Sequence, residues 1–242
     1  MTRTLAGKAA VVTGSTSGIG LGIARALAAE GCNVMLNGFG DAGEIEALRA
    51  SIEADCGVRA AYDPADLTDG AAAAGLVTAA EETFGRLDVL VNNAGVQHVS
   101  PVEDFPPEAW DKVIALNLSS CFHTTRAAVP GMKARGWGRI INVASAHGLV
   151  ASPNKAAYVA AKHGVLGLTK VTALELAETG LTCNAICPGW VRTPLVEAQI
   201  ETRAANEGKS IDQASVELLQ EKQPSKRFTT VEQLGGLAVV GL

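Results

Sequence analysis

Short apolar runs alternate with longer amphipathic segments along most of the chain. Near-continuous apolar runs predict buried strands at 8–13, 33–37, 58–62, 87–91, 140–143 and 181–187. Helical spacing of apolar residues predicts helices at 21–30, 44–55, 71–84, 110–135 with a break, a stretch ending near 178, and 231–240. Strands that alternate with helices pair in parallel through right-handed crossovers. The pattern therefore predicts an α/β fold with a doubly wound parallel sheet, in one domain over 1–242.

A glycine-rich turn follows the first predicted strand and opens the first predicted helix. It reads Gly14-Ser15-Thr16-Ser17-Gly18-Ile19-Gly20. Glycines let the backbone pass close to a pyrophosphate, and a helix that starts at Gly18 directs free N–H groups and its positive dipole end at that anion. Placed between a strand and a helix, the turn indicates a dinucleotide site. A glycine-rich turn that binds nothing is the alternative.

The tip of the second strand bears on the choice of cofactor. An acidic residue there would bind a ribose 2′-OH, and an arginine would bind a 2′-phosphate. The chain has Gly38-Phe39 instead, and the uncharged bulk of Phe39 favours NAD over NADP. Asp41 would either repel a phosphate or cap the following helix. Beyond the third strand, Asp66-Leu67 is a candidate adenine contact, and Asp66 is equally well explained as a helix cap.

Candidate chemistry lies between 139 and 164. A short strand at 140–143 leads to Ser145, and a helix then carries Tyr158 and Lys162. Residues four apart share a helix face, so the Lys162 ammonium is expected beside the Tyr158 phenol. A nearby cation favours the phenolate, and a serine hydroxyl donates to a substrate oxygen, so the three residues suit general base catalysis. A tyrosine and a lysine at this spacing usually have no such role.

The ends of six predicted strands gather the remaining candidates. In doubly wound sheets, ligands bind outside the carboxyl ends of the strands. The residues just beyond those ends are Gly14, Phe39, Asp66, Asn93, Ser145 and Pro188. The small residues Asn93-Ala94-Gly95 would let a cofactor ring lie against the backbone. Six coincident placements are harder to explain by chance than any single motif.

Composition excludes several other classes of protein. The net charge of −5 and the absence of a Lys/Arg cluster argue against a nucleic-acid surface. The five cysteines include no CxxC pair, and Cys183 and Cys187 would lie roughly 13 Å apart on a strand, too far for a disulfide. We therefore expect thiols in a reducing compartment, no metal site and a cytoplasmic protein. No signal peptide is evident, and the apolar run 234–242 is too short to span a bilayer.

Several motifs together resemble the short-chain dehydrogenase/reductase family over residues 6–240. They are TGSTSGIG at 13–20, NNAG at 92–95, Asn117, Ser145, YVAAK at 158–162 and Pro188-Gly189. The resemblance implies a Rossmann-type fold in which Tyr158 transfers a proton and Ser145 steadies the substrate oxygen. It also implies that Lys162 assists Tyr158 and holds the nicotinamide ribose, and that Asn117 supports a water-linked proton relay.

The same resemblance implies an NAD site and a quaternary structure. The implied cofactor residues are Gly14, Thr16, Ser17, Gly18, Ile19, Gly20, Phe39, Asp66, Leu67, Asn93, Ala94, Gly95, Tyr158, Lys162, Pro188, Gly189, Val191 and Thr193. Members of the family form tetramers or dimers, so a homo-oligomer is expected. They also look longer than this chain and continue into a seventh strand, which the expected sheet lacks.

Polar residues around this machinery point to a small anionic substrate. Ser145 and Tyr158 are joined by Gln97, His147, Lys155, Trp190 and Gln199. Hydrogen-bond donors and one positive charge suit a carboxylate. The set is similar to that of bacterial family members that oxidise (R)-3-hydroxybutyrate to acetoacetate. An exposed Lys155, a structural His147 and a surface Gln199 are the alternatives, while His98, His123 and His163 are expected to be structural.

Two other functions remain open on the sequence. One is reduction of a 3-oxoacyl thioester or another small ketone with NADPH, which Phe39 and the polar residues disfavour. The other is a non-catalytic nucleotide-binding scaffold, which would not need Ser145, Tyr158 and Lys162 together. The charged segment from about 190 to 228, interrupted by glycine and proline, is expected to form a lid over the substrate.

Overall fold

A computed structural model describes residues 3–242, and its centre is a six-stranded parallel sheet. The strands are β1 (Ala9–Val12), β2 (Asn33–Asn37), β3 (Ala60–Asp63), β4 (Val89–Asn92), β5 (Gly138–Val143) and β6 (Leu181–Ile186). Their order is β3-β2-β1-β4-β5-β6, and all five pairings are parallel. This is the Rossmann order, with its switch point between β1 and β4, and it confirms the predicted doubly wound sheet.

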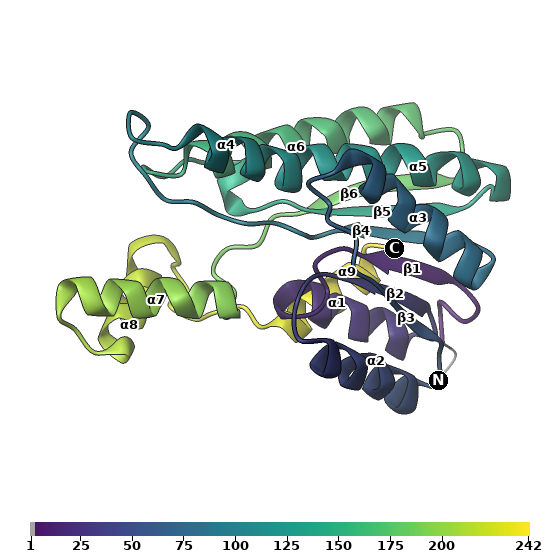
Figure 1. Ribbon diagram of the computed structural model, residues 1–242, viewed down its shortest axis with the longest axis horizontal. Coiled ribbons are helices and arrows are strands. Elements are labelled where there is room, and N and C mark those ends of the chain that lie inside the picture. The colour runs from purple at the N-terminus through teal and green to yellow at the C-terminus, as the bar shows by residue number, and fades with distance from the viewer. Residues whose placement is uncertain (1–2) are drawn as a thin grey trace.

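Helices cover both faces of the sheet (Figure 1). One layer contains α1 (Gly18–Ala29), α2 (Ala42–Cys56) and α9 (Val231–Val240). The other contains α3 (Gly70–Phe84), α4 (Pro107–Ile114), α5 (Ser120–Arg135) and α6 (Ala156–Glu175). With both faces covered, the strands must be apolar on both sides, which explains their near-continuous apolar sequence.

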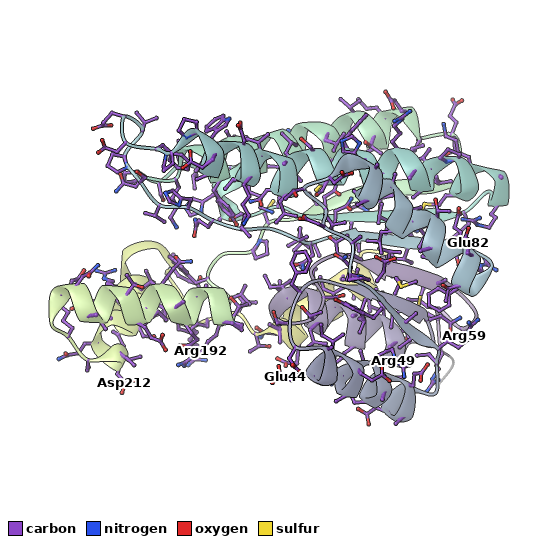
Figure 2. All side chains as sticks on the ribbon, viewed as in Figure 1. Glu44, Arg49, Arg59, Glu82, Arg192 and Asp212 are labelled. Carbon is purple, nitrogen blue, oxygen red and sulfur yellow. The ribbon has the colours of Figure 1, made fainter. Side chains whose placement is uncertain are left out.

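Alternate residues of each strand supply the two halves of the core. Val12 and Val91 pack in the cluster beneath α1, whereas Val11 and Leu90 pack in the cluster beneath α3 and α5. Asp88 and Lys162 are buried, whereas many other charged side chains lie at the surface. In Figure 2 the labelled Glu44, Glu82 and Asp212 lie on the outer surfaces of their helices, where they are exposed. In the described part of the chain, no helix combines the length and the apolar character needed to cross a bilayer.

The predicted elements are all present, with ends that differ by up to three residues. One of the largest differences concerns the predicted helix 110–135, which begins three residues earlier, at Pro107. Proline suits the first turn of a helix because its missing N–H has no intrahelical partner there. The expected break is a π-helical turn, Ala115–Ser119, which joins α4 to α5 and contains Asn117. π-Turns occur frequently at functional sites.

The segment expected as a lid forms a pair of helices that stands away from the sheet (Figure 1, left). It comprises α7 (Pro194–Glu207) and α8 (Ile211–Lys222). Val196, Ile200 and Ala214 belong to an apolar cluster of its own. Its two ends meet at a parallel bridge between Val191 and Thr229. The helix pair thus has its own packing and joins the body at one narrow point.

Candidate active site

The turn between β1 and α1 packs so closely on the end of β4 that it requires glycine. Gly14 and Gly18 have φ values of +60° and +56°, which side-chain-bearing residues rarely adopt. A Cβ added to Gly14 would lie 2.9 Å from Cα of Ala94, and one on Gly20 would lie 2.2 Å from the Gly14 carbonyl oxygen. The Asn93 side chain donates to that carbonyl at 3.0 Å. These contacts form a rigid, narrow cradle.

The cradle presents an open helix N-terminus. Ser17 precedes α1 but makes no capping bond through its side chain, and the first turn carries no acidic residue. The first N–H groups of a helix have no intrahelical partner, and the helix dipole favours an anion beside them. The turn therefore fits the pyrophosphate of a dinucleotide, as the sequence predicted.

A cavity of about 360 Å³ runs from this cradle to the ends of β5 and β6. Seventeen of the residues proposed from sequence line it: Gly14, Thr16, Ser17, Gly18, Ile19, Phe39, Leu67, Asn93, Ala94, Gly95, Ser145, Tyr158, Lys162, Pro188, Gly189, Val191 and Thr193. Gly20, Asp66 and Asn117 do not line it, and neither do the proposed substrate residues Gln97, His147, Lys155, Trp190 and Gln199. The sheet thus brings residues from six strand ends to one cavity.

At the end of the cavity formed by β2 and β3, Asp66 caps a turn. Its carboxylate accepts the N–H of Thr68 at 2.9 Å and its hydroxyl at 2.8 Å, and these bonds lower the pKa of Asp66. The neighbouring Leu67 faces the cavity. Sequence reasoning missed Asn37, whose buried amide donates to the Ala65 carbonyl at 3.0 Å and lines the same region. Asn37 could have been singled out from the sequence, because it is a polar residue at the end of a buried strand.

The tip of β2 offers no cation to a phosphate. Phe39 is 69% exposed, and its carbonyl accepts the Thr16 hydroxyl at 3.1 Å. Asp41 caps α2 by accepting the N–H groups of Gly43 and Glu44, at 2.9 and 3.0 Å. Among the described residues that line the cavity there is no arginine. The alternatives for Asp41 are therefore compatible, because a capping carboxylate at this tip also repels a phosphate.

Ser145, Tyr158 and Lys162 meet at the other end of the cavity. Lys162 is only 5% exposed, and its ammonium donates to the Val143 carbonyl at 2.7 Å. The same ammonium lies 5.7 Å from the centroid of the Tyr158 ring. Ser145 lies two residues beyond the end of β5, and its Oγ accepts the N–H of His147 at 3.1 Å. A phenol, a hydroxyl and a buried cation therefore face one space, which suits proton transfer from an alcohol.

Asn117 supports this end of the cavity from the π-turn. The residue is fully buried, its Oδ1 accepts the N–H of Val96 and its Nδ2 donates to the Val96 carbonyl, both at 2.9 Å. This paired bond fixes the loop that follows β4. Val96 and Leu116, which the sequence did not single out, line the cavity as a result.

Four of the proposed substrate residues form two pairs, although none of the four lines the cavity. The Gln199 amide, in α7, donates to Gln97 Oε1 in the loop after β4 at 3.1 Å. The Lys155 ammonium, at the start of α6, lies 5.7 Å from the centroid of the Trp190 ring. In both pairs one residue belongs to the lid segment and the other to the body. The structure thus brings Gln97 and Gln199, which are 102 positions apart in the sequence, into contact.

His147 completes this group. Its ring meets the Tyr158 ring edge-on, with centroids 6.0 Å apart, and its Nε2 lies 2.8 Å from the Ser152 hydroxyl. Two other histidines have local contacts: His98 packs edge-on against Phe105, and His163 Nδ1 lies 2.9 Å from the carbonyl of its own helix, one turn back. Of these three histidines, His147 is the one whose ring packs against Tyr158.

The cysteines offer no second chemistry. All five are free, and burial raises the pKa of Cys32 and of Cys183 to about 12. Burial likewise raises the pKa of Cys121. Thiols with such values stay protonated near neutral pH, so they are poor nucleophiles and metal ligands. The described residues contain no group of His, Cys, Asp and Glu side chains arranged to hold a metal ion.

The fold and the site together define a class of protein. A family model for short chain dehydrogenases matches residues 8–204. The chain belongs to this family of oxidoreductases, and the resemblance seen in its motifs is confirmed.

Comparison with individual proteins shows which members of this family the chain resembles. D-beta-hydroxybutyrate dehydrogenase of Cupriavidus necator is 61% identical over 236 residues, which cover 97% of this chain and 90% of that protein. Among solved structures, an actinorhodin polyketide ketoreductase with NADPH aligns with a TM-score of 0.89 and 36% identity, covering 97% of this chain and 89% of the other. An NAD+-bound xylitol dehydrogenase aligns with a TM-score of 0.89 and 30% identity, covering 98% and 93%.

Proposed function

We propose that the protein is an NAD-dependent dehydrogenase that oxidises (R)-3-hydroxybutyrate to acetoacetate, and that the reaction is reversible. The observation that carries the substrate is the 61% identity, over nearly the whole chain, with D-beta-hydroxybutyrate dehydrogenase of Cupriavidus necator. The site supports it independently, because Ser145, Tyr158 and Lys162 share one cavity and the polar His147 packs against Tyr158.

Each catalytic side chain has a distinct task in this proposal. The deprotonated Tyr158 oxygen accepts the proton of the substrate hydroxyl, and Ser145 donates a hydrogen bond to the same substrate oxygen. The Lys162 ammonium stabilises the negative charge on Tyr158, and its bond to the Val143 carbonyl fixes it in place. NAD held along the glycine cradle and the cavity would supply the acceptor for the hydride of the substrate C3. Asn117 supports a water-linked path for the proton from Lys162.

The polar residues Gln97, His147, Lys155 and Gln199 are proposed to hold the substrate carboxylate. Lys155 supplies the positive charge, while Gln97, His147 and Gln199 supply hydrogen bonds, and Trp190 packs beside Lys155. A fixed carboxylate determines which face of C3 meets the cofactor, so this positioning contributes to the rate. The lid, about 190–228, closes over the substrate within a single catalytic domain 1–242.

NAD is the proposed cofactor because the ribose end of the cavity disfavours a 2′-phosphate. Phe39 occupies the strand tip without a charge, Asp41 adds a negative charge nearby, and the described lining residues include no arginine. The glycine cradle fits the pyrophosphate shared by both cofactors. These features separate the proposal from reduction of 3-oxoacyl thioesters with NADPH.

The decisive test is turnover by the purified protein. We expect NADH formation from (R)-3-hydroxybutyrate with NAD, a much lower rate with NADP, and little activity on the (S) enantiomer. Other small hydroxy acids and a 3-oxoacyl thioester, each tried with both cofactors, serve as comparisons. Preference for the thioester with NADPH would support the reductase alternative. Tight NADH binding without turnover of any of these substrates would support a nucleotide-binding scaffold.

Self-association is proposed for the outer face of α5 and α6. Phe122, Val171 and Leu174 are exposed there, and Leu174 is 78% exposed. Large exposed apolar side chains that gather on a surface mark protein interfaces. Light scattering coupled to size exclusion should give the mass of a dimer or tetramer, and Leu174→Glu should lower it. A monomeric wild-type mass would contradict the proposal.

The free cysteines favour a cytoplasmic location.

A further inference from the structure

Four buried side chains form a continuous chain of hydrogen bonds behind the catalytic residues. The Thr124 hydroxyl of α5 donates to Asn92 Oδ1 of β4 at 2.7 Å. Asn92 Nδ2 donates to Asn142 Oδ1 of β5 at 2.9 Å. Asn142 Nδ2 donates to the Thr169 hydroxyl of α6 at 2.8 Å. We call this the Thr–Asn–Asn–Thr chain, and none of its members is more than 7% exposed.

The chain runs in one direction when the Thr124 hydroxyl donates to Asn92 at 2.7 Å rather than to the Ser120 carbonyl, which lies 2.9 Å from the same oxygen. Thr169 accepts from Asn142 and passes its own proton to the Val165 carbonyl at 2.8 Å, so the last hydroxyl also has an acceptor. Hydrogen bonds aligned in this way polarise and strengthen one another. Burying four polar side chains carries a desolvation penalty that apolar residues would not incur. Packing alone therefore does not explain why these four positions are polar, and the reason must lie in the hydrogen bonds that they form.

The α6 end of the chain acts together with the catalytic lysine. Lys162 and Thr169 are seven residues apart on α6, so they share one face and are separated by about 10 Å along the helix. Lys162 binds the Val143 carbonyl, and Thr169 binds Asn142, the preceding residue of β5. Two bonds at two heights fix both the tilt and the axial position of α6. That position determines where Tyr158, one turn before Lys162, stands relative to Ser145.

The α5 end repeats this arrangement. Thr124 lies seven residues after Asn117, and it fixes α5 to Asn92 of β4 while Asn117 fixes the loop after that strand. The bond between Asn92 and Asn142 then joins the two strands at their side chains as well as through their backbones. The chain thus holds both α5 and α6 to the sheet. The helix α6 carries Tyr158 and Lys162, and α5 follows the π-turn that contains Asn117.

We propose that the Thr–Asn–Asn–Thr chain is a positioning network that sets the register of α6, and hence of Tyr158, against the substrate-facing end of β5. Thr169 and Asn142 are positioning residues for proton transfer and touch neither substrate nor cofactor. This inference rests on the proton-transfer role proposed for Tyr158, but it does not depend on which alcohol is oxidised.

The test compares three variants of α6. Thr169→Val keeps the shape and removes the hydroxyl, whereas Thr169→Ser keeps the hydroxyl. Thr172→Val is the matched control, because Thr172 is also 7% exposed on the same helix but is not a member of the chain. We expect kcat per NADH-binding site to fall about tenfold in Thr169→Val, since small misplacements of reacting groups lower rates steeply. The Michaelis constants for NAD and substrate should stay unchanged.

Thr169→Ser and Thr172→Val should both keep the wild-type kcat. Counting NADH-binding sites by fluorescence titration removes any effect of unfolded protein, and Thr124→Val tests the opposite end if Thr169→Val does not fold. Wild-type kcat in a folded Thr169→Val or Thr124→Val variant, or an equal loss in Thr172→Val, would overturn the proposal. Failure of the catalytic role itself is distinguishable, because Tyr158→Phe would then remain active.

Discussion

Replacing Tyr158 by phenylalanine is expected to lower kcat by about 10³- to 10⁴-fold, the upper range for loss of a positioned acid or base. The variant removes one oxygen and leaves the ring, so the edge-on packing against His147 should persist. NADH binding should also persist, because the glycine cradle and the adenosine end of the cavity lie on other elements. Stopped-flow turnover and fluorescence titration of NADH measure the two effects separately.

Tyr62 provides the control, since the chain contains only two tyrosines. Its hydroxyl donates to the Gly38 carbonyl at 2.8 Å, at the adenosine end. Tyr62→Phe should therefore affect the Michaelis constant for NAD more than kcat. If Tyr158→Phe kept more than about a tenth of the wild-type kcat, general base catalysis by this residue would be excluded, because the effect expected is far larger.

Local sequence signals were sufficient for the framework of the site. Parallel strands that must be apolar on both faces leave continuous apolar runs, so the sheet was predictable from Val11, Val12 and their counterparts in other strands. The glycine-rich turn was equally readable, because the close approach of Gly20 to the Gly14 carbonyl excludes any side chain. In both cases the physical constraint acts within a few residues along the chain.

Contacts between distant segments were less accessible. Gln97 and Gln199 are 102 residues apart, and only the placement of the lid shows that their amides meet. The sequence likewise gives Asn142 as a polar residue within a strand, and does not reveal that its partners are Asn92 and Thr169. Side-chain pairing of this kind depends on helix register, which apolar periodicity specifies only to within about a residue.

Two parts of the molecule contribute residues to the site: the sheet body and the segment at about 190–228. The glycine cradle is closely packed on the end of β4, and the Thr–Asn–Asn–Thr chain is buried within the sheet body. The residues proposed for the carboxylate include Trp190 and Gln199, which belong to a segment with its own apolar cluster and a narrow attachment. Ser145, Tyr158 and Lys162, proposed for proton transfer, lie in the body, whereas the segment 190–228 contributes Val191 and Thr193 to the cavity. Mutations in the two parts should separate kcat from the Michaelis constant for the substrate.

Lys155→Met is expected to lower kcat/KM for 3-hydroxybutyrate by about 10- to 100-fold, the range for losing a hydrogen bond to a charged group. The methionine keeps an unbranched side chain to pack near Trp190, so the positive charge is the main loss. Most of the change should appear in KM, because Tyr158 and Lys162 are untouched. Steady-state kinetics at saturating NAD measures it.

The charge can also be removed from the substrate. With the neutral amide of 3-hydroxybutyrate, wild type and Lys155→Met should have similar kcat/KM values, since no carboxylate remains for the ammonium to bind. Lys170→Met, at an exposed position on the same helix, is the matched control and should retain full discrimination between acid and amide. A Lys155→Met enzyme that still preferred the acid as strongly as wild type would show that another group binds the carboxylate.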